Sequence, residues 1–526
     1  MQIVIPMSGY GERFRAAGYT VPKPLIEIDG KPIIEYVVGM FPGEDDFLFI
    51  CNQEHLDTQI YQMERILKCV APKGVVVGIA PHDRGPVHAV LRARQYLRSN
   101  QPLIINYCDF ACDWDYNNFK KYVEENKCDG CIPCYRGFHP HTIWSKNYAY
   151  VREENLMGCN IQEKQPFTDN HQSEFASSGT YFFKSAEFFE NYAEQSIAAG
   201  LHVDGEYYVS MVYKPMFNEG CRIFVYELNH FMQWGTPNDL EDYVYWSGAF
   251  RRLNKKKETI KESGILLMPM AGFGSRFEKA GYKIPKPLIE VSGVPMAERA
   301  LRSLPKTDEQ IFVLREDIQC KTKLVNSLSN SSLNPKFVTI DSPTDGQAST
   351  CMEGIKSVHG DTCVTISACD HGILYDGDCL EKLLRDSNVD VIVWGVVGYP
   401  GAIYNPEMYG WIDWNTQDGK ISRVSVKAPL KNPRTDPIVV GTFTFKRISD
   451  FTIAVSRMKA RGAHINGEYY VDTAVNDSLA LGLNCVLFLV DYYLCWGTPN
   501  DLNTYHYWEE CFENWEQHPY SAVGKT

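Results

Sequence analysis

The hexapeptide Pro-Lys-Pro-Leu-Ile-Glu occurs twice in this chain, at residues 22–27 and again at residues 285–290. Two other motifs repeat at nearly the same distance. Glu468 of Gly-Glu-Tyr-Tyr-Val lies 262 residues after Glu206, and the same spacing separates the two copies of Trp-Gly-Thr-Pro-Asn-Asp-Leu. A period this long is too great for a solenoid repeat and matches the size of a whole domain. The sequence therefore predicts two homologous domains, residues 1–255 and 263–526, joined near the polar stretch 251–264.

The composition describes a chain with ample material for two cores, because 44% of its 526 residues are hydrophobic and 13% are aromatic. The net charge of -13 argues against nucleic-acid binding. The N-terminal residues enter a strand with no basic region and no long apolar segment, so we expect no membrane insertion and a cytoplasmic location. The oligomeric state stays open, with a homo-oligomer as one option.

Each half begins with a short apolar strand that runs into a glycine-containing loop and then an arginine. Further apolar runs alternate with helix-like stretches, which is typical of α/β folds. We expect a three-layer architecture in each half, with a mixed, mainly parallel sheet.

The opening loop has the pattern Gly-x-Gly-x-Arg in both halves. Glycines let backbone N–H groups approach an oxyanion closely, and the arginine adds a forked cation. About ten residues later, two prolines hold one lysine in a fixed backbone, so loop, arginine and lysine together suit a triphosphate. The loop residues and the lysine are Gly9, Gly11, Arg13 and Lys23 in the first copy, and Gly272, Gly274, Arg276 and Lys286 in the second.

A glycine between a strand and a helix, Gly85 or Gly346, leaves room for a flat base, although a simple helix cap would explain it equally well. The next apolar strand ends in Cys-Asp, at Asp109 or Asp370. A carboxylate at the carboxyl end of a strand faces the ligand crevice of open α/β folds, where it can hold Mg²⁺ on phosphates.

Two other patterns admit a structural and a functional interpretation. The Cys-x-x-Cys-x-x-Cys run at residues 128–134 has metal-like spacing, but the second half has no cysteines there, so we interpret it as a buried strand. Asp-x-Asp triplets at residues 113–115 and 376–378 resemble the metal motif of glycosyltransferases. Because helix-like stretches follow them, we interpret these triplets as helix N-caps.

The last candidates are acids, lysines and glycines in the second part of each half. We expect a lysine on a strand in both copies. The acid before this lysine is present in the first copy, whereas valine stands at that position in the second. A glycine precedes a later strand, and an acid stands beside paired tyrosines, which is a possible sugar or polyol contact. These residues are Glu163, Lys164, Gly179 and Glu206 in the first copy, and Lys427, Gly441 and Glu468 in the second.

Taken in order, these motifs resemble those of the sugar-phosphate nucleotidyltransferase superfamily, the nucleotide-sugar pyrophosphorylases, over both halves of the chain. The resemblance implies two tandem GT-A-like, Rossmann-like domains. It also implies that a phosphorylated sugar or alcohol attacks the α-phosphorus of an NTP and expels pyrophosphate, with Mg²⁺ as cofactor, as in the synthesis of precursors for surface or capsular polysaccharide. In this assignment Arg13, Lys23, Arg276 and Lys286 hold the triphosphate, Asp109 and Asp370 hold the metal, and Lys164 and Lys427 receive the acceptor phosphate.

The copies depart from the family pattern in three places. Many relatives have a second metal carboxylate next to Gly-Thr-Pro, where this chain has Gln233 and Cys495. Glu12 puts a negative charge before the loop arginine of the first copy, and Val426 replaces the acid before Lys427. Two alternatives stay open: a GT-A-type glycosyltransferase that uses the Asp-x-Asp triplets, and a regulatory protein that binds a nucleotide sugar without turnover. The base, the acceptor and the active copy are not readable from the sequence.

Overall fold

The computed structural model describes residues 1–254 and 260–518, and its chain forms two compact units. One unit consists of Met1–Ser247 with Glu510–Thr526, and the other of Gly248–Glu509. The C-terminal residues that the structure describes, 510–518, therefore group with the first unit. The predicted boundary at residues 251–264 includes residues 255–259, which lie outside the described residues.

The first unit contains a ten-stranded mixed sheet. In spatial order its strands are β5 (Val75–Ile79), β4 (Phe47–Asn52), β1 (Gln2–Met7), β6 (Leu103–Asn106), β12 (Thr180–Phe183), β8 (Gly130–Tyr135), β13 (Ile223–Glu227), β10 (Met157–Glu163), β9 (Ala149–Glu154) and β11 (Phe175–Ser177). The strands from β5 to β6 pair in parallel, as do β8 and β13, and the other pairs are antiparallel. Parallel strands are covered on both faces in α/β proteins, and β1 and β4 are accordingly buried at every residue.

The second unit repeats this strand order. Its path runs β19 (Pro335–Ile340), β18 (Lys306–Arg315), β15 (Lys261–Pro269), β20 (Val364–Ser367), β25 (Ile438–Phe445), β22 (Val391–Val396) and β26 (Cys485–Leu489), with the hairpin β23 (Gly410–Trp414) and β24 (Ile421–Val426) attached through β25. The strands from β19 to β20 are parallel, as are β22 and β26. The prediction of two tandem α/β domains is confirmed.

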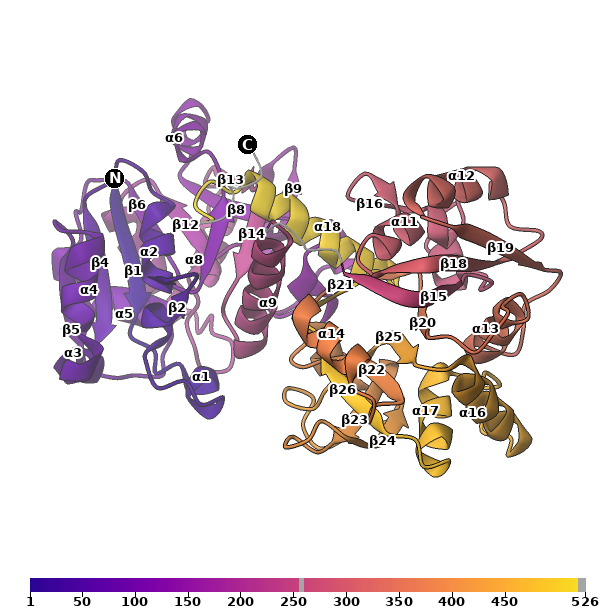
Figure 1. The fold of residues 1–526 in the computed structure, drawn as a ribbon. Coiled ribbons are helices and arrows are strands. Elements are labelled where there is room, and N and C mark those ends of the chain that lie inside the picture. The colour runs from indigo at the N-terminus through magenta and orange to yellow at the C-terminus, as the bar shows by residue number, and fades with distance from the viewer. Residues whose placement is uncertain (255–259, 519–526) are drawn as a thin grey trace. The chain divides into compact units, whose positions relative to one another are not determined.

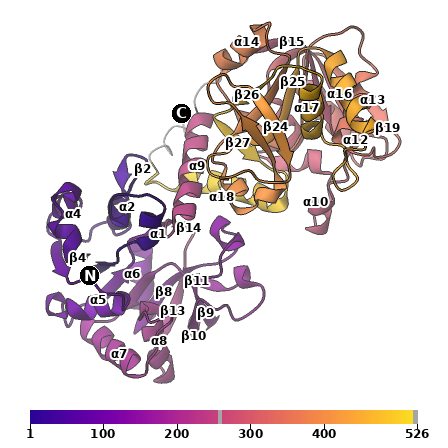
Figure 2. The same ribbon diagram turned by 90° about the horizontal axis from the view of Figure 1, so that it is seen from below.

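Helices supply the outer layers of each unit. In the second unit α13 (Gln347–Ile355), α16 (Ile448–Ala460) and α17 (Val471–Ala480) lie side by side (Figure 2), and their apolar residues share one core with the sheet. The corresponding helices of the first unit are α5 (Pro86–Arg92), α7 (Ala186–Ala198) and α8 (Val209–Asn218). Other helices of the two units are α1 (Glu12–Ala16), α2 (Ile33–Gly39), α3 (Gln53–Asp57), α4 (Met63–Val70), α6 (Tyr116–Glu125), α9 (Pro237–Leu253), α10 (Ser275–Lys279), α11 (Met296–Leu301), α12 (Lys321–Ser331), α14 (Gly377–Arg385), α15 (Pro400–Tyr404) and α18 (Pro499–Asn514).

Short two-stranded ribbons complete each unit. They are β2 (Glu27–Ile28) with β3 (Lys31–Pro32), β7 (Phe110–Asp113) with β14 (His230–Gln233), β16 (Glu290–Val291) with β17 (Val294–Pro295), and β21 (His371–Leu374) with β27 (Tyr492–Cys495). The ribbons β7–β14 and β21–β27 bring the strand-end aspartates beside the Trp-Gly-Thr-Pro stretches, because Trp234 N donates to Asp109 O and Trp496 N donates to Asp370 O.

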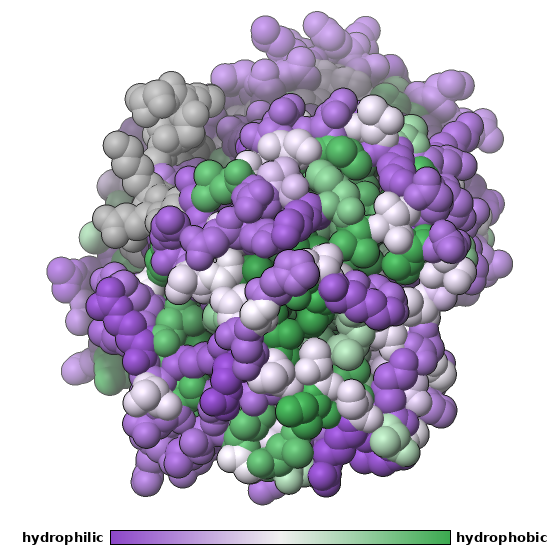
Figure 3. All heavy atoms as spheres, turned by 45° about the vertical axis from the view of Figure 1, so that its right-hand side comes forward, coloured by the Kyte–Doolittle hydropathy of each residue, from purple (hydrophilic) through white to green (hydrophobic). Residues whose placement is uncertain are grey.

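The surface seen in Figure 3 mixes polar side chains with separate apolar patches. Among the described residues the most exposed large apolar side chains are Ile60, Phe273 and Leu333. Within residues 1–254 and 260–518, no helix combines the length and the apolar character that crossing a membrane requires.

Two structural interpretations of the sequence are confirmed. Cys131 and Cys134 of the cysteine run lie on the buried strand β8 and are fully buried, and Cys128, which is also buried, lies just before this strand. Asp115 caps α6 by accepting a hydrogen bond from Asn118 N, and Asp376 caps α14 by accepting one from Cys379 N. These caps occupy matching places in the two copies, but Asp115 is the last residue of its triplet and Asp376 is the first of its own.

Candidate functional site

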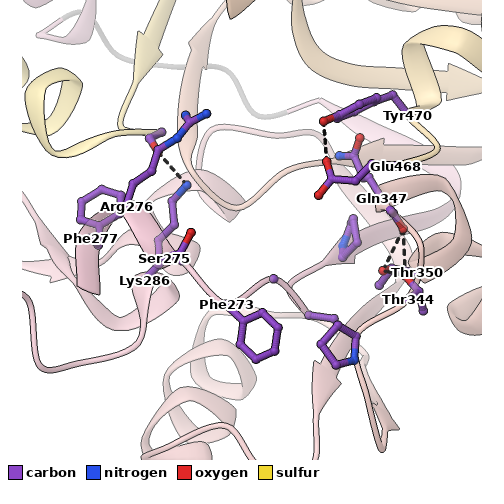
Figure 4. A pocket seen from close by; sticks show the side chains of 17 residues that line it. Phe273, Ser275, Arg276, Phe277, Lys286, Thr344, Gln347, Thr350, Glu468 and Tyr470 are labelled. Carbon is purple, nitrogen blue, oxygen red and sulfur yellow. Dashed lines mark hydrogen bonds between the residues drawn. The ribbon is translucent and has the colours of Figure 1, made fainter. Parts of the chain in front are cut away.

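A pocket of about 550 Å³ lies in the second unit, at the carboxyl ends of its parallel strands. Figure 4 shows Arg276 and Lys286 on one side of this pocket, and Gln347, Glu468 and Tyr470 on the other. Its lining includes six residues that the sequence analysis selected: Gly272, Gly274, Arg276, Lys286, Gly346 and Glu468. Motifs spread over about 200 residues of sequence thus line one cavity.

The glycine loop connects β15 to α10. Gly274 adopts a left-handed conformation, φ 67°, as the N-cap of α10, a conformation that side chains disfavour. Its missing Cβ would lie 3.1 Å from Lys286 Cβ, so glycine here lets the loop pack against the lysine. By contrast, a Cβ at Gly272 would meet no atom within 4 Å. Protein packing does not require glycine at 272, and that face of the loop is turned to the pocket.

Lys286 and Asp370 form an ion pair in the floor of the site. The lysine Nζ lies 2.5 Å from Asp370 Oδ2 and 3.0 Å from the carbonyl oxygen of Gly497. Burial raises the pKa of Asp370, but Lys286 and His371 outweigh burial and hold that pKa well below its usual range. Burial lowers the pKa of Lys286, and Asp370 more than reverses this effect. Both groups are therefore charged at neutral pH, in a largely desolvated place.

Gly346 joins the pocket to the Gly-Glu-Tyr-Tyr-Val turn. Its φ is 128°, and a Cβ there would lie 2.5 Å from Tyr469 N and 2.6 Å from Tyr469 O. Hydrogen bonds from Ala348 N to Tyr469 O and from Tyr469 N to Asp345 O hold the two segments together. Close packing against this turn accounts for glycine at 346, so the residue need not be selected by a base.

Glu468 and Tyr470 of the turn form one chain of contacts with Lys427, which follows β24. Tyr470 Oη donates to Glu468 Oε2 and accepts from Lys427 Nζ over 3.0 Å. The same ammonium lies 4.8 Å from the centre of the Tyr470 ring, an attractive cation–π contact. Lys427, which does not line the pocket itself, is thereby tied to two residues that do.

The first unit builds the equivalent ion pair and loop. Lys23 Nζ lies 2.7 Å from Asp109 Oδ2, and Gly11 caps α1 with φ 65°. A Cβ at Gly9 would meet no atom within 4 Å. Arg13 is exposed, as is Glu12, the acid that replaces Ser275 of the second copy.

Gly85, Lys164 and Glu206 also occupy matching places in the first unit. A Cβ at Gly85 would lie 2.8 Å from Tyr207 N. Lys164 Nζ lies 5.1 Å from the Tyr208 ring centre and donates to Asp204 Oδ2 over 3.0 Å.

The glycines before the later strands support the loop that carries the strand-end aspartate. Gly179 and Gly441 have φ values of 96° and 78°. Gly179 O accepts from Tyr107 N, and a Cβ at Gly179 would lie 3.0 Å from the Tyr107 ring. Gly441 O accepts from Ala368 N, and a Cβ there would lie 3.4 Å from His371 Cε1. Both glycines contact the loop of the strand-end aspartate, and Gly441 is not among the residues that line the pocket of the second unit.

The residues present fit a magnesium ion held by one carboxylate and by phosphate oxygens, which is a common mode of Mg²⁺ binding. Each site has one strand-end carboxylate, Asp109 or Asp370. A second acid lies nearby on the following helix: burial raises the pKa of Asp239 to about 6, and the charge of Asp109 adds to the increase. The hydroxyls of Thr236 and Thr498 accept from the backbone N–H groups of Asp239 and Asp501 at the starts of α9 and α18, and they donate to the carboxylates of the same two aspartates.

Sequence reasoning missed several residues of the site. Phe273, Thr344, Gln347 and Thr350 line the pocket. Tyr470 belongs to the tyrosine pair that the sequence pointed to, but its link to Lys427 was not predicted. Phe273 lies inside the glycine loop, so its place in that motif was a usable signal. The threonines and the glutamine had no signal, because they lie in a helix-cap segment that differs between the copies.

The sequence matches the model of the MobA-like NTP transferase domain twice, over residues 3–165 and 266–428. The chain therefore belongs to this family and carries its domain in tandem. The predicted membership in the sugar-phosphate nucleotidyltransferase superfamily is confirmed. Each match ends one residue after the strand-end lysine, Lys164 or Lys427.

The relatives share low sequence identity with the chain. It is 24% identical to the bifunctional protein GlmU of Fervidobacterium nodosum over 212 residues, which are 40% of this chain and 42% of that protein. It is 27% identical to the mannose-1-phosphate guanylyltransferase catalytic subunit beta of Danio rerio over 195 residues, 35% of this chain and 50% of that protein. The chain thus spans about half the length of these relatives or less.

Two solved structures are similar over about half of this chain. One is a nucleoside-diphosphate-sugar pyrophosphorylase from Vibrio cholerae RC9, with 20% identity and a TM-score of 0.39, covering 46% of this chain and 98% of that one. The other is an inositol-1-phosphate CTP transferase from T. maritima, with 13% identity and a TM-score of 0.37, covering 48% of this chain and 96% of that one.

Proposed function

We propose that the chain is a nucleotidyltransferase that condenses an NTP with a sugar 1-phosphate or a phosphorylated alcohol and releases pyrophosphate. The observation that carries the proposal is the pocket of the second unit, where the glycine loop, Arg276 and Lys286 face the Glu468–Tyr470 wall. Cations and open backbone on one side suit a triphosphate, and an acid with a phenol on the other side suits a hydroxylated acceptor.

For this reaction the protein has mainly to position the two substrates and to neutralise their charge. A phosphate oxygen of the acceptor, already an anion, forms a bond to the α-phosphorus, and the bond from that phosphorus to the bridging oxygen breaks. Pyrophosphate leaves with the electron pair, and no covalent enzyme intermediate is needed. Arg276 and Lys286 neutralise charge on the triphosphate, and Lys427 receives the acceptor phosphate.

Mg²⁺ bound by Asp109 or Asp370 would neutralise charge on the phosphates and polarise them. In our proposal the first unit has the same parts in Arg13, Lys23 and Lys164. The names of the relatives, which include a mannose-1-phosphate guanylyltransferase, support sugar phosphates as acceptors. A product of this class would serve as a precursor for surface polysaccharide, and the use of an NTP fits a cytoplasmic location.

Pyrophosphate release tests the proposal. The full-length protein is assayed with Mg²⁺, each of the four NTPs, and a panel of glucose 1-phosphate, mannose 1-phosphate and glycerol 3-phosphate. Release with one NTP and one acceptor, lost in the Lys23→Ala or the Lys286→Ala variant, supports the proposal and identifies the working copy. Tight nucleotide-sugar binding without release from any pair would instead favour a regulatory binding protein.

A further inference from the structure

The two units differ at the acid that precedes the strand-end lysine. Glu163 ends β10 and Val426 ends β24, and the lysine that follows has φ 58° in one unit and 55° in the other. In both units the lysine N–H donates to the carbonyl of the tyrosine just before the neighbouring strand, Tyr148 or Tyr409, over 2.9 Å and 3.0 Å. The local backbone is therefore the same, and the second unit has simply lost a carboxylate at this point of the strand.

The second unit has an acid on the helix that faces this strand. In the first unit Ser210, the second residue of α8, donates from its hydroxyl to Glu163 Oε2 over 2.5 Å. The second residue of α17 is Asp472, which lies 262 residues after Ser210. The first copy thus has an acid on the strand and a hydroxyl on the helix. The second copy has valine on the strand and an acid on the helix.

A third position has changed with these two. Ala149 is the register partner of Glu163, whereas Gly410 is the register partner of Val426. A Cβ at Gly410 would lie 2.4 Å from Asp472 Oδ2, closer than real Cβ contacts. The glycine therefore makes room for the carboxylate of Asp472, and the three substitutions form one coordinated exchange.

The carboxylate of Asp472 has acceptor capacity that the protein does not use. Within residues 1–254 and 260–518, it accepts no hydrogen bond from any other residue, whereas Glu163 accepts one from Ser210. Burial raises the pKa of Asp472 to about 6, and the charge of Lys427 works against that increase. Asp472 is therefore close enough to Lys427 for the charge of the ammonium to act on it.

We propose, building on the proposed function, that Asp472 binds a hydroxyl group of the phosphorylated acceptor in the second unit, in place of the acid that the first unit carries at Glu163. Lys427 would hold the phosphate of the same molecule. Because the acid projects from α17 and not from the strand, its position differs from that of Glu163. The two units then differ in which hydroxyl of a sugar or polyol phosphate they recognise.

The test uses the full-length protein with the Lys23→Ala change, which leaves only the second unit to release pyrophosphate. In this background Asp472→Asn should raise the KM for the acceptor about tenfold or more and leave the KM for the NTP unchanged, since a hydrogen bond to a charged group is weakened. Monodeoxy forms of the same acceptor identify the hydroxyl. With the deoxy acceptor that lacks this hydroxyl, Asp472→Asn should not change the KM for the acceptor further.

A triple variant provides the matched control for folding. Val426→Glu, Asp472→Ser and Gly410→Ala together rebuild the arrangement of the first unit, and should restore acceptor binding with a changed preference among the deoxy acceptors. If Asp472→Asn changes the KM of every deoxy acceptor equally, or if release does not depend on Lys286, the inference is wrong although the proposed function stands. If the wild-type chain releases no pyrophosphate from any pair, the proposed function fails first.

Discussion

The ammonium of Lys286 lies 2.5 Å from Oδ2 of Asp370, so the cation predicted for phosphate and the carboxylate predicted for metal are each other's nearest charged partner. Each group keeps the other ionised in a desolvated floor. Their functions are therefore coupled, because the removal of either group leaves the other without its nearest charged partner.

Lys286→Ala should lower kcat/KM for pyrophosphate release by at least about 100-fold, because one preorganised cation is lost from the triphosphate site. Lys286→Arg should rescue little, since a guanidinium cannot replace a compact ammonium at this distance from Asp370. Thermal unfolding of each variant separates lost catalysis from lost folding. Full activity in the alanine variant, with Lys23 also replaced, would refute the assignment.

Asp115→Ala should cost about 1 kcal/mol of stability and leave pyrophosphate release unchanged, because this carboxylate caps α6. Asp109→Ala should abolish whatever release depends on the first unit. Steady-state kinetics and denaturant unfolding of the two variants check this. The reverse order, with Asp115 more important for turnover, would favour the glycosyltransferase alternative.

Gly346→Ala should destabilise the second unit by about 3 kcal/mol. The new Cβ would press into the backbone of Tyr469, and the φ of 128° disfavours any side chain. Gly272→Ala is the control, since a Cβ there meets no atom within 4 Å. Chemical unfolding monitored by tryptophan fluorescence compares the two, and equal losses would show that the Tyr469 contact is not the cause.

Glu262 gives the second unit a pH-dependent stability. This side chain is only 4% exposed, and burial raises the pKa of its carboxyl to about 7, above the unfolded value of 4.5, against hydrogen bonds from Cys363 and Thr365. The native state then binds more protons than the unfolded state between these pH values, so stability should fall as the pH rises from about 4.5 through 7, by roughly 3 kcal/mol. Glu262→Gln should flatten this dependence of the melting temperature, and an unchanged slope would contradict the prediction.

Trp515 completes the core of the first unit. It is 1% exposed, and its ring lies 5.6 Å from that of Tyr36 and 6.3 Å from that of Trp234. Trp515→Ala should therefore destabilise the first unit by about 3 to 5 kcal/mol. Calorimetry that resolves two transitions should show the loss in one transition only, assigned by the parallel effect of a core substitution such as Phe49→Ala.

Local motifs made much of the site predictable from the sequence. The glycine loop, the lysine between prolines and the strand-end aspartate are each short, and the internal repeat showed which of them persist. The Asp-x-Asp triplets could also be distinguished from metal ligands in the sequence, because a helix-like stretch follows each of them in both copies.

Exchanges between distant segments could not be predicted in this way. In the sequence, Val426 indicates only that the second copy lacks the acid of the first. Asp472 lies 46 residues further on, and only the packing of α17 on β24 brings the two residues together. The reason for glycine at 85 and 346 was equally hidden, since it depends on the backbone of a turn about 120 residues away.

The grouping of residues 510–518 with the first unit has a consequence for the order of events during synthesis. Chains emerge from the ribosome N-terminus first, and N-terminal domains usually fold before the rest is made. Here the packing of the first unit includes Trp515, the hydrogen bond from Gln517 Nε2 to Gly39 O, and the ring of His518, whose Nε2 lies 3.1 Å from Ser247 Oγ. The half that is translated first therefore cannot complete its packing until the whole second unit has been translated.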